Sequence, residues 1–182
     1  MIDVDRGSEV IEVPTWTVLG SFHVARFDGL HALIRAGRAG DRDAVATILA
    51  AVRQAPPGVW PAIVSGIVVP VPGHLPGPPG ELVAAAAELI AAMHGWHPTR
   101  DALRRGTAAP EAKAGVPRDP VVEAATLEWQ ARGQGGAIVL VDDVVRTGVT
   151  LRACAEATRL AGDTRPVVAV ALARAVVLAG AR

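Results

Sequence analysis

The chain has 182 residues, of which 51% are hydrophobic and 3% aromatic, with no tyrosine and a net charge of zero. This length fits a single domain over residues 1–182, with a core of Ala, Val, Leu and Ile. Basic residues are not clustered, which argues against a nucleic-acid partner, and the single Cys154 excludes an internal disulfide and a multi-cysteine zinc site. No apolar run reaches the ~18 residues of a membrane span and no signal-peptide pattern opens the chain, so we expect a cytoplasmic protein without a membrane partner.

The first third of the chain predicts two short strands and two helices. Trp16–Leu19 and Phe22–Phe27 are apolar runs separated by Gly20-Ser21, which favours a hairpin. Apolar residues recur with helical spacing after Asp41, which predicts a helix that begins there and ends at the Pro-Pro-Gly that follows. The stripe consists of Val45, Ile48, Leu49 and Val52.

Ile63–Val71 is a second apolar run and predicts a buried strand that leads into Pro70–His74. A strand that ends in a tight Pro/Gly turn often directs the backbone toward a ligand. A proline-stiffened turn without a ligand is the alternative. A helix is expected over Glu81–His94, with Gly95 as its C-terminal stop. Because His94 and His97 lie on either side of that stop, we do not expect them to form a metal site.

A long segment without apolar periodicity follows a short strand predicted at Asp101–Arg105. Residues 106–118 contain Lys113, the only lysine of the chain. Loops of this length are usually functional or disordered. The alternatives are a mobile loop that closes over a ligand and a solvated linker with an incidental lysine.

The stretch Gly135–Thr150 contains the residues best suited to bind a ligand. Ala137–Val141 is a continuous apolar run, typical of a strand buried on both faces, and two carboxylates, Asp142 and Asp143, follow it directly. A loop with small and hydroxyl residues then leads into a helix from about Val149. Free N–H groups and the positive end of a helix dipole form a phosphate cradle. The alternative is a surface turn in which the two aspartates cap a helix.

The remaining elements complete the fold class. A short helix over Pro120–Thr126 and an edge strand over Leu127–Gln130 precede the central stretch. Cys154 belongs to the helix that follows this stretch and should point into the protein core. Pro166–Ala173 predicts a final buried strand, with an apolar tail from Ala175. Alternating strands and helices indicate a doubly wound α/β sheet, mostly parallel with helices on both faces. Ligands of such sheets bind beyond the carboxyl ends of the strands.

The thirteen residues IVLV-DD-VVR-TGVT, Ile138–Thr150, resemble the signature of the type I phosphoribosyltransferases. The segment VVPVPGH resembles the corresponding loop of the ComF-like (competence protein F) branch, and residues 106–118 stand where that family carries a flexible hood. Three departures matter. Arg146 replaces the Asp of purine-salvage members, LPGPPGE replaces the usual Arg-Gly-Phe-Asn-Gln, and the cysteine-rich zinc module is absent.

The resemblance implies a phosphoribosyltransferase-like fold with Mg²⁺-bound phosphoribosyl pyrophosphate as donor and an unidentified base or amine as acceptor. It implies that Asp142 and Asp143 hold ribose hydroxyls and the metal, and that Lys113 or Arg105 stabilises the pyrophosphate. Further substrate-binding residues implied are Pro72, Gly73, His74, Val144, Val145, Arg146, Thr147, Gly148, Val149 and Thr150. A non-catalytic regulatory or competence-associated protein is the alternative, and a homodimer is left open.

Overall fold

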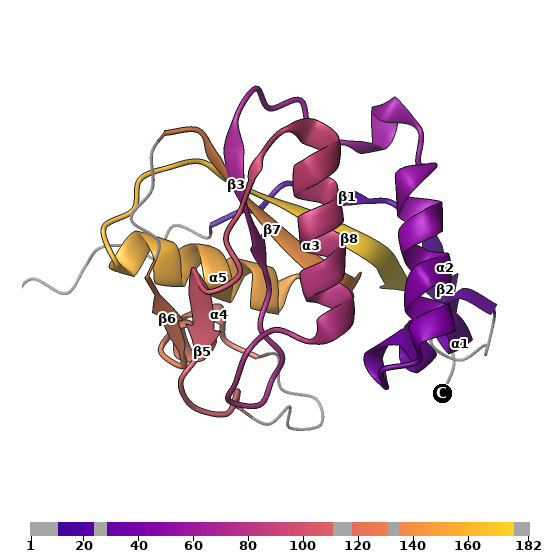
Figure 1. Ribbon diagram of the computed structural model, residues 1–182. Coiled ribbons are helices and arrows are strands. Elements are labelled where there is room, and N and C mark those ends of the chain that lie inside the picture. Colours follow the sequence, from indigo (N-terminus) through magenta and orange to yellow (C-terminus); the bar gives the residue numbers. More distant parts are fainter. Residues whose placement is uncertain (1–10, 24–28, 111–117, 131–134, 177–182) are drawn as a thin grey trace, which may run out of the picture.

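The computed structural model describes residues 11–23, 29–110, 118–130 and 135–176, and its fold is α/β (Figure 1). A central sheet of six strands has the order β1-β8-β7-β3-β4, and β2 also pairs with β8. Every pairing in this sheet is parallel. Its strands are β1 (Thr15–Thr17), β2 (Ser21–His23), β3 (Gly66–Pro70), β4 (His97–Pro98), β7 (Ala137–Val145) and β8 (Val167–Val176).

The hairpin predicted at Gly20-Ser21 is wrong. Both β1 and β2 run parallel along β8, so the chain keeps its direction through this point. Between them, the N–H groups of Val18 and Leu19 donate to the carbonyls of Ala171 and Leu172 at 3.0 and 2.8 Å. The ten-residue β8 is long enough to pair with both segments. Gly20, with a φ of 97°, therefore interrupts the strand without reversing it.

Two predicted helix boundaries are confirmed by their caps. The helix α2 (Arg42–Arg53) begins after Asp41, whose side chain accepts hydrogen bonds from the N–H groups of Asp43 and Ala44, each at 3.0 Å. The helix α3 (Glu81–His94) ends at Gly95, which has a left-handed φ of 68°. The other helices are α1 (Gly29–Arg38), α4 (Pro120–Ala124), α5 (Val149–Leu160) and a 3₁₀ turn at Pro57–Val59.

Helices cover both faces of the sheet (Figure 1). Side chains alternate between the faces along β7, because successive residues of a strand point in opposite directions. Val139 and Val141 pack with apolar residues of α1, α2 and α3, whereas Ile138 and Leu140 pack with residues of α4 and α5. The doubly wound class predicted from the sequence is confirmed at this level. Cys154 is fully buried in the second cluster, as predicted.

The connections of the sheet diverge between β3 and β7. The chain passes from β3 through α3 to β4 on one side, and from β7 through α5 to β8 on the other. The two strands are direct neighbours, with Pro70 opposite Val141. A crevice beyond the carboxyl ends of such strands is the usual ligand site of open α/β sheets. The loop after β3 therefore begins beside the two aspartates of β7.

Three strand boundaries differ from the prediction. β7 does not stop at Val141 but continues through both aspartates to Val145. It can do so because β8 also extends further than predicted, to Val176, and keeps the pair in register. β3 begins at Gly66 rather than Ile63.

The predicted short strands flanking the long loop form a separate sheet. β5 (Leu103–Arg105) and β6 (Leu127–Trp129) pair antiparallel with each other, apart from the central sheet. The predicted helix over Pro120–Thr126 is α4, which ends at Ala124, two residues earlier than expected. Within the described residues, no helix is long and apolar enough to cross a membrane.

Candidate functional site

A cavity of about 600 Å³ opens at the carboxyl ends of β3 and β7. This volume lies within the usual range of small-molecule sites. It joins segments that are distant in the sequence: the loop after β3, the start of the long loop after β5, the two aspartates and the first turn of α5. Its lining residues are Arg38, Val71, Pro72, Gly73, His74, Gly80, Val83, Arg105, Ala109, Pro110, Arg118, Glu123, Asp142, Asp143, Val144 and Thr150.

Asp143 is held by an arginine that the sequence did not single out. Nε and Nη2 of Arg38, the last residue of α1, donate to the two carboxylate oxygens of Asp143. The Asp143 side chain is only 8% exposed, whereas Arg38 is 53% exposed. The hydrogen bonds to Asp143 raise the pKa of Arg38. The two residues are 105 positions apart, so no local pattern could have predicted the pair.

Asp142 has a different environment from its neighbour. It lines the cavity, and its Oδ1 accepts a hydrogen bond from the N–H of Asp143 at 2.8 Å. In the part of the chain that the structure describes, no arginine forms an ion pair with it. Burial, together with the negative charge of Asp143, raises the pKa of Asp142 to about 8. Its carboxyl group therefore holds a proton at neutral pH unless a cation lies beside it.

The donor set is compatible with Mg²⁺ at Asp142. Mg²⁺ binds one or two carboxylates and completes its shell with water and substrate phosphates. Asp142 has a carboxylate without an arginine partner, whereas both oxygens of Asp143 accept from Arg38. Among the described residues, no group of three or more His, Cys, Asp or Glu side chains could hold a metal by itself. A metal here would need ligands from the substrate.

A second, smaller pocket of about 80 Å³ lies at the start of α5. Gly148 precedes the helix with a left-handed φ of 72°, and no side chain among the described residues caps the helix. The first N–H groups of α5 therefore lack a side-chain acceptor. Apart from Arg118, the lining residues all come from this stretch: Asp142, Val144, Val145, Arg146, Thr147, Gly148, Val149, Thr150 and Leu151.

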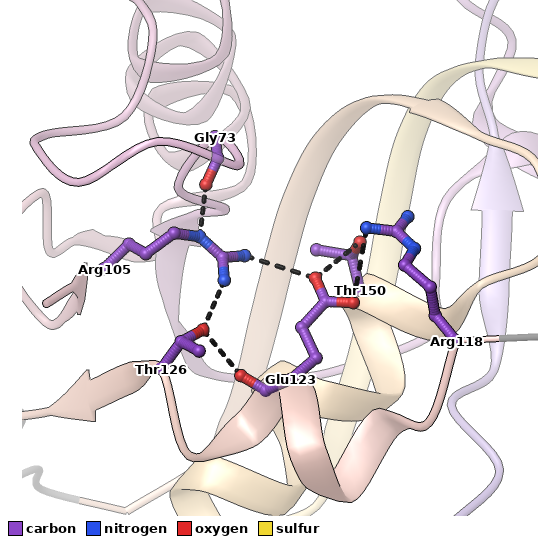
Figure 2. Close-up of polar contacts among 6 residues, drawn as sticks. All are labelled: Gly73, Arg105, Arg118, Glu123, Thr126 and Thr150. Carbon is purple, nitrogen blue, oxygen red and sulfur yellow. Dashed lines mark hydrogen bonds and ion pairs between the residues drawn. The ribbon is translucent and has the colours of Figure 1, made fainter. Parts of the chain in front are cut away.

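A buried polar network ties the loop after β3 to the rest of the site (Figure 2). Arg105 is 3% exposed, and each of its guanidinium nitrogens has a hydrogen-bond acceptor. Nε donates to the carbonyl of Gly73, Nη1 to the Thr126 hydroxyl at 2.5 Å and Nη2 to Oε1 of Glu123 at 3.2 Å. Arg105 thus lines the cavity, but its hydrogen bonds go to other protein groups rather than toward a ligand.

Glu123 is the centre of this network. Its side chain is 1% exposed, and Oε1 also accepts from the Thr150 hydroxyl at 3.1 Å. Oε2 has no hydrogen bond, but it lies 3.5 Å from Nη1 of Arg118. Glu123 is not among the site residues predicted from the sequence. The available signal was an acidic residue within the otherwise apolar short segment Pro120–Ala124, which begins after the capping Asp119.

The predicted site residues gather around these two pockets. Pro72, Gly73, His74, Arg105, Asp142, Asp143, Val144 and Thr150 line the large cavity, and Val145, Arg146, Thr147, Gly148 and Val149 line the small one. The Thr150 hydroxyl, however, donates to Glu123. Lys113 lies outside the described residues.

Two residues that the sequence set aside, His94 and Cys154, lie away from the cavity. His94 packs against Trp60 and Trp96, with ring centroids 4.9 and 4.4 Å apart, and partial burial lowers the pKa of its imidazole. Burial raises the pKa of the Cys154 thiol, which keeps it protonated. Neither residue lines the cavity.

Comparison with known proteins adds no assignment to this geometry. No family model matches the chain, and no curated protein sequence matches it at a significant level.

Proposed function

We propose that this protein is a phosphoribosyltransferase of the type I fold, which transfers the phosphoribosyl group from Mg²⁺-bound phosphoribosyl pyrophosphate to a base or amine. One observation carries the proposal. A cavity at the divergence of β3 and β7 joins a Pro/Gly loop to two carboxylates, and a smaller pocket that shares Asp142, Thr150 and Arg118 with it lies at the uncapped start of a helix. These groups match the pyrophosphate, the ribose hydroxyls and the 5′-phosphate of such a donor.

The start of α5 suits the phosphate end. Its first N–H groups have no side-chain cap, and the positive end of the helix dipole favours an anion there. The small pocket at this point, about 80 Å³, can hold one phosphate group. Gly148 provides the left-handed turn that lets the chain pass directly from β7 into the helix.

The two aspartates suit the ribose. Transfer at the anomeric carbon develops positive charge on the sugar ring, which nearby carboxylates stabilise. Asp142 has no arginine partner in the described chain and can accept hydrogen bonds from hydroxyl groups. The same carboxylate, with donor phosphates, would hold Mg²⁺, which when bound neutralises charge on the leaving pyrophosphate.

The loop after β3 suits the pyrophosphate. Apart from its two chain neighbours, no heavy atom of the described residues lies within 4 Å of the position that a Cβ of Gly73 would occupy, so a ligand can approach the backbone closely. Arg105 fixes the carbonyl of the same residue, and His74 accepts a backbone hydrogen bond from Ala109 at 2.8 Å. A rigid loop loses little conformational entropy when an anion binds.

The test is release of pyrophosphate from the Mg²⁺-bound donor against a panel of bases and amines. We expect release with one acceptor and its loss in the double variant Asp142→Asn with Asp143→Asn. Asp101→Asn removes one exposed carboxylate outside the cavity and serves as the control. Retained turnover in the double variant would reject the assigned roles. Absence of donor binding in the wild type would mean that only the fold is shared.

A regulatory protein that binds the donor without turnover is the second candidate. The observation that favours it is the bidentate pair in which Arg38 engages both oxygens of Asp143. A carboxylate held in this way is less available to substrate hydroxyls. Tight donor binding without pyrophosphate release across the panel would support this candidate over the enzyme.

A further inference from the structure

Arg118 differs from Arg38 and Arg105, the other two arginines that line the large cavity, because its N–H groups make no hydrogen bond with the described residues. It lines both the large cavity and the small pocket at the start of α5. Within the described residues, its one polar contact is the ion pair with Glu123 at 3.5 Å, which is too long for a hydrogen bond of ordinary strength. Its side chain is 33% exposed, so a ligand can reach it.

Arg105 provides the contrast. Its three guanidinium nitrogens donate to Gly73, Thr126 and Glu123, and its side chain is 1% exposed. Because Arg105 is buried and three of its five N–H groups are already engaged, it is less accessible to an anion than Arg118. Arg105 and Arg118 together carry two positive charges, and Glu123 supplies one negative charge between them. The cluster therefore has an excess of one positive charge at the junction of the two pockets.

The lining of the small pocket shows which ligand position lies next to the Arg118 charge. Every lining residue except Arg118 belongs to the stretch 142–151, so Arg118 is the side chain that closes the pocket from another part of the chain. Glu123 fixes it there, because the same carboxylate accepts from Thr150 in the first turn of α5 and from the buried Arg105. Arg118 thus faces the uncapped helix start.

We propose that Arg118 is a further substrate-binding residue, the cation that binds the phosphate group held in the small pocket at the start of α5. An arginine suits this position because its planar guanidinium can donate two hydrogen bonds to one phosphate. The inference deepens the proposed function by assigning a residue outside the signature stretch to the phosphate end of the donor. It differs from the sequence prediction, in which Arg105 or Lys113 provides the cation for the donor.

The first experiment is calorimetry with inorganic phosphate as the probe. Arg118→Ala should weaken phosphate binding about 10-fold or more, as expected for a lost charge-assisted hydrogen bond. Arg118→Lys should give an intermediate affinity, because it keeps the charge and loses the bidentate geometry. Arg104→Ala is the matched control, since Arg104 is exposed on the same short strand as Arg105 and lines neither pocket. Equal phosphate affinity in wild type and Arg118→Ala, or no phosphate binding by the wild type, would overturn the proposal.

The second experiment locates the anion. Crystals soaked in sulfate should show it between the first N–H groups of α5 and the Arg118 guanidinium. Sulfate at the helix start without any contact to the Arg118 guanidinium would contradict the proposal. Failure of the proposed function can be distinguished from failure of this inference. Phosphate binding that depends on Arg118, without any pyrophosphate release, would support the role of Arg118 and reject the transferase activity.

Discussion

Two arginine–carboxylate pairs flank the cavity, and they differ in burial. Both carboxylates are shielded, since Asp143 is 8% and Glu123 1% exposed. Their arginines are not alike: Arg38 is 53% exposed and Arg105 only 1%. Arg38 contacts a single carboxylate, whereas Arg105 joins Glu123 to Thr126 and to the backbone of Gly73.

The difference indicates separate roles for the two pairs. Removal of one partner from a buried pair leaves an uncompensated charge and costs about 3–5 kcal/mol, whereas exposed pairs contribute about 0–1 kcal/mol. The buried pair therefore maintains the shape of the site. The pair at the rim can open at a small cost, which allows Asp143 to exchange Arg38 for a ligand.

Arg105→Ala should have the largest effect on stability. It leaves the buried Glu123 without its closest cation and removes a donor from the carbonyl of Gly73. We expect the free energy of unfolding to fall by about 3–5 kcal/mol. Urea denaturation measures this, with Arg104→Ala as a control expected to change stability by less than about 0.5 kcal/mol. Equal effects of the two substitutions would show that the buried network contributes nothing.

Asp142 is a carboxylate of the site that, within the described residues, has neither an exposed arginine partner, as Asp143 has, nor a buried one, as Glu123 has. Its pKa is about 8 in the folded protein, above the ordinary value of 3.8. The folded state therefore binds the proton more tightly than the unfolded state does. The contribution of Asp142 to the free energy of unfolding is greatest below pH 4 and falls as the pH rises toward 8, by at most about 1.4 kcal/mol per pH unit. Asp142→Asn should remove this dependence. The measurement is the free energy of unfolding of wild type and variant as a function of pH, without Mg²⁺. Parallel curves would refute the raised pKa of Asp142.

Glu123→Gln should weaken the buried pair from the other side. The amide keeps the shape and one acceptor oxygen but leaves the Arg105 charge uncompensated, at a cost of about 1–3 kcal/mol. Combined with Arg105→Ala, the two losses should not add, because the residues share one interaction. A double-mutant cycle on the free energy of unfolding measures the coupling. Strict additivity would mean that the residues act independently.

Arg38→Ala should cost less stability than Arg105→Ala, because Arg38 is half exposed and water can replace it at the Asp143 oxygens. The difference from wild type should shrink further at high ionic strength. Donor binding should become tighter, since Asp143 no longer has an internal partner. Denaturation at two salt concentrations checks the first point and calorimetry the second. A loss of stability as large as that of Arg105→Ala would erase the contrast between the pairs.

The sequence by itself determined the features that depend on near neighbours. The apolar run before Asp142 predicts a buried strand, and Gly148 with the residues after it predicts the turn into a helix. Asp41 and Gly95 mark helix ends through hydrogen bonds and a backbone conformation that involve only adjacent residues. The order of these elements was enough to indicate a doubly wound sheet and the edge at which a ligand would bind.

Only the tertiary structure decided which partners each charge would have. Arg38 reaches Asp143 across 105 residues, and Glu123 gathers Arg105, Arg118 and Thr150 from three separate segments. The direction of β2 and the extension of β7 through Asp142 likewise depend on the length of β8. Hydrogen bonds and ion pairs of this kind form between groups that folding brings together, and local propensity carries no information about them.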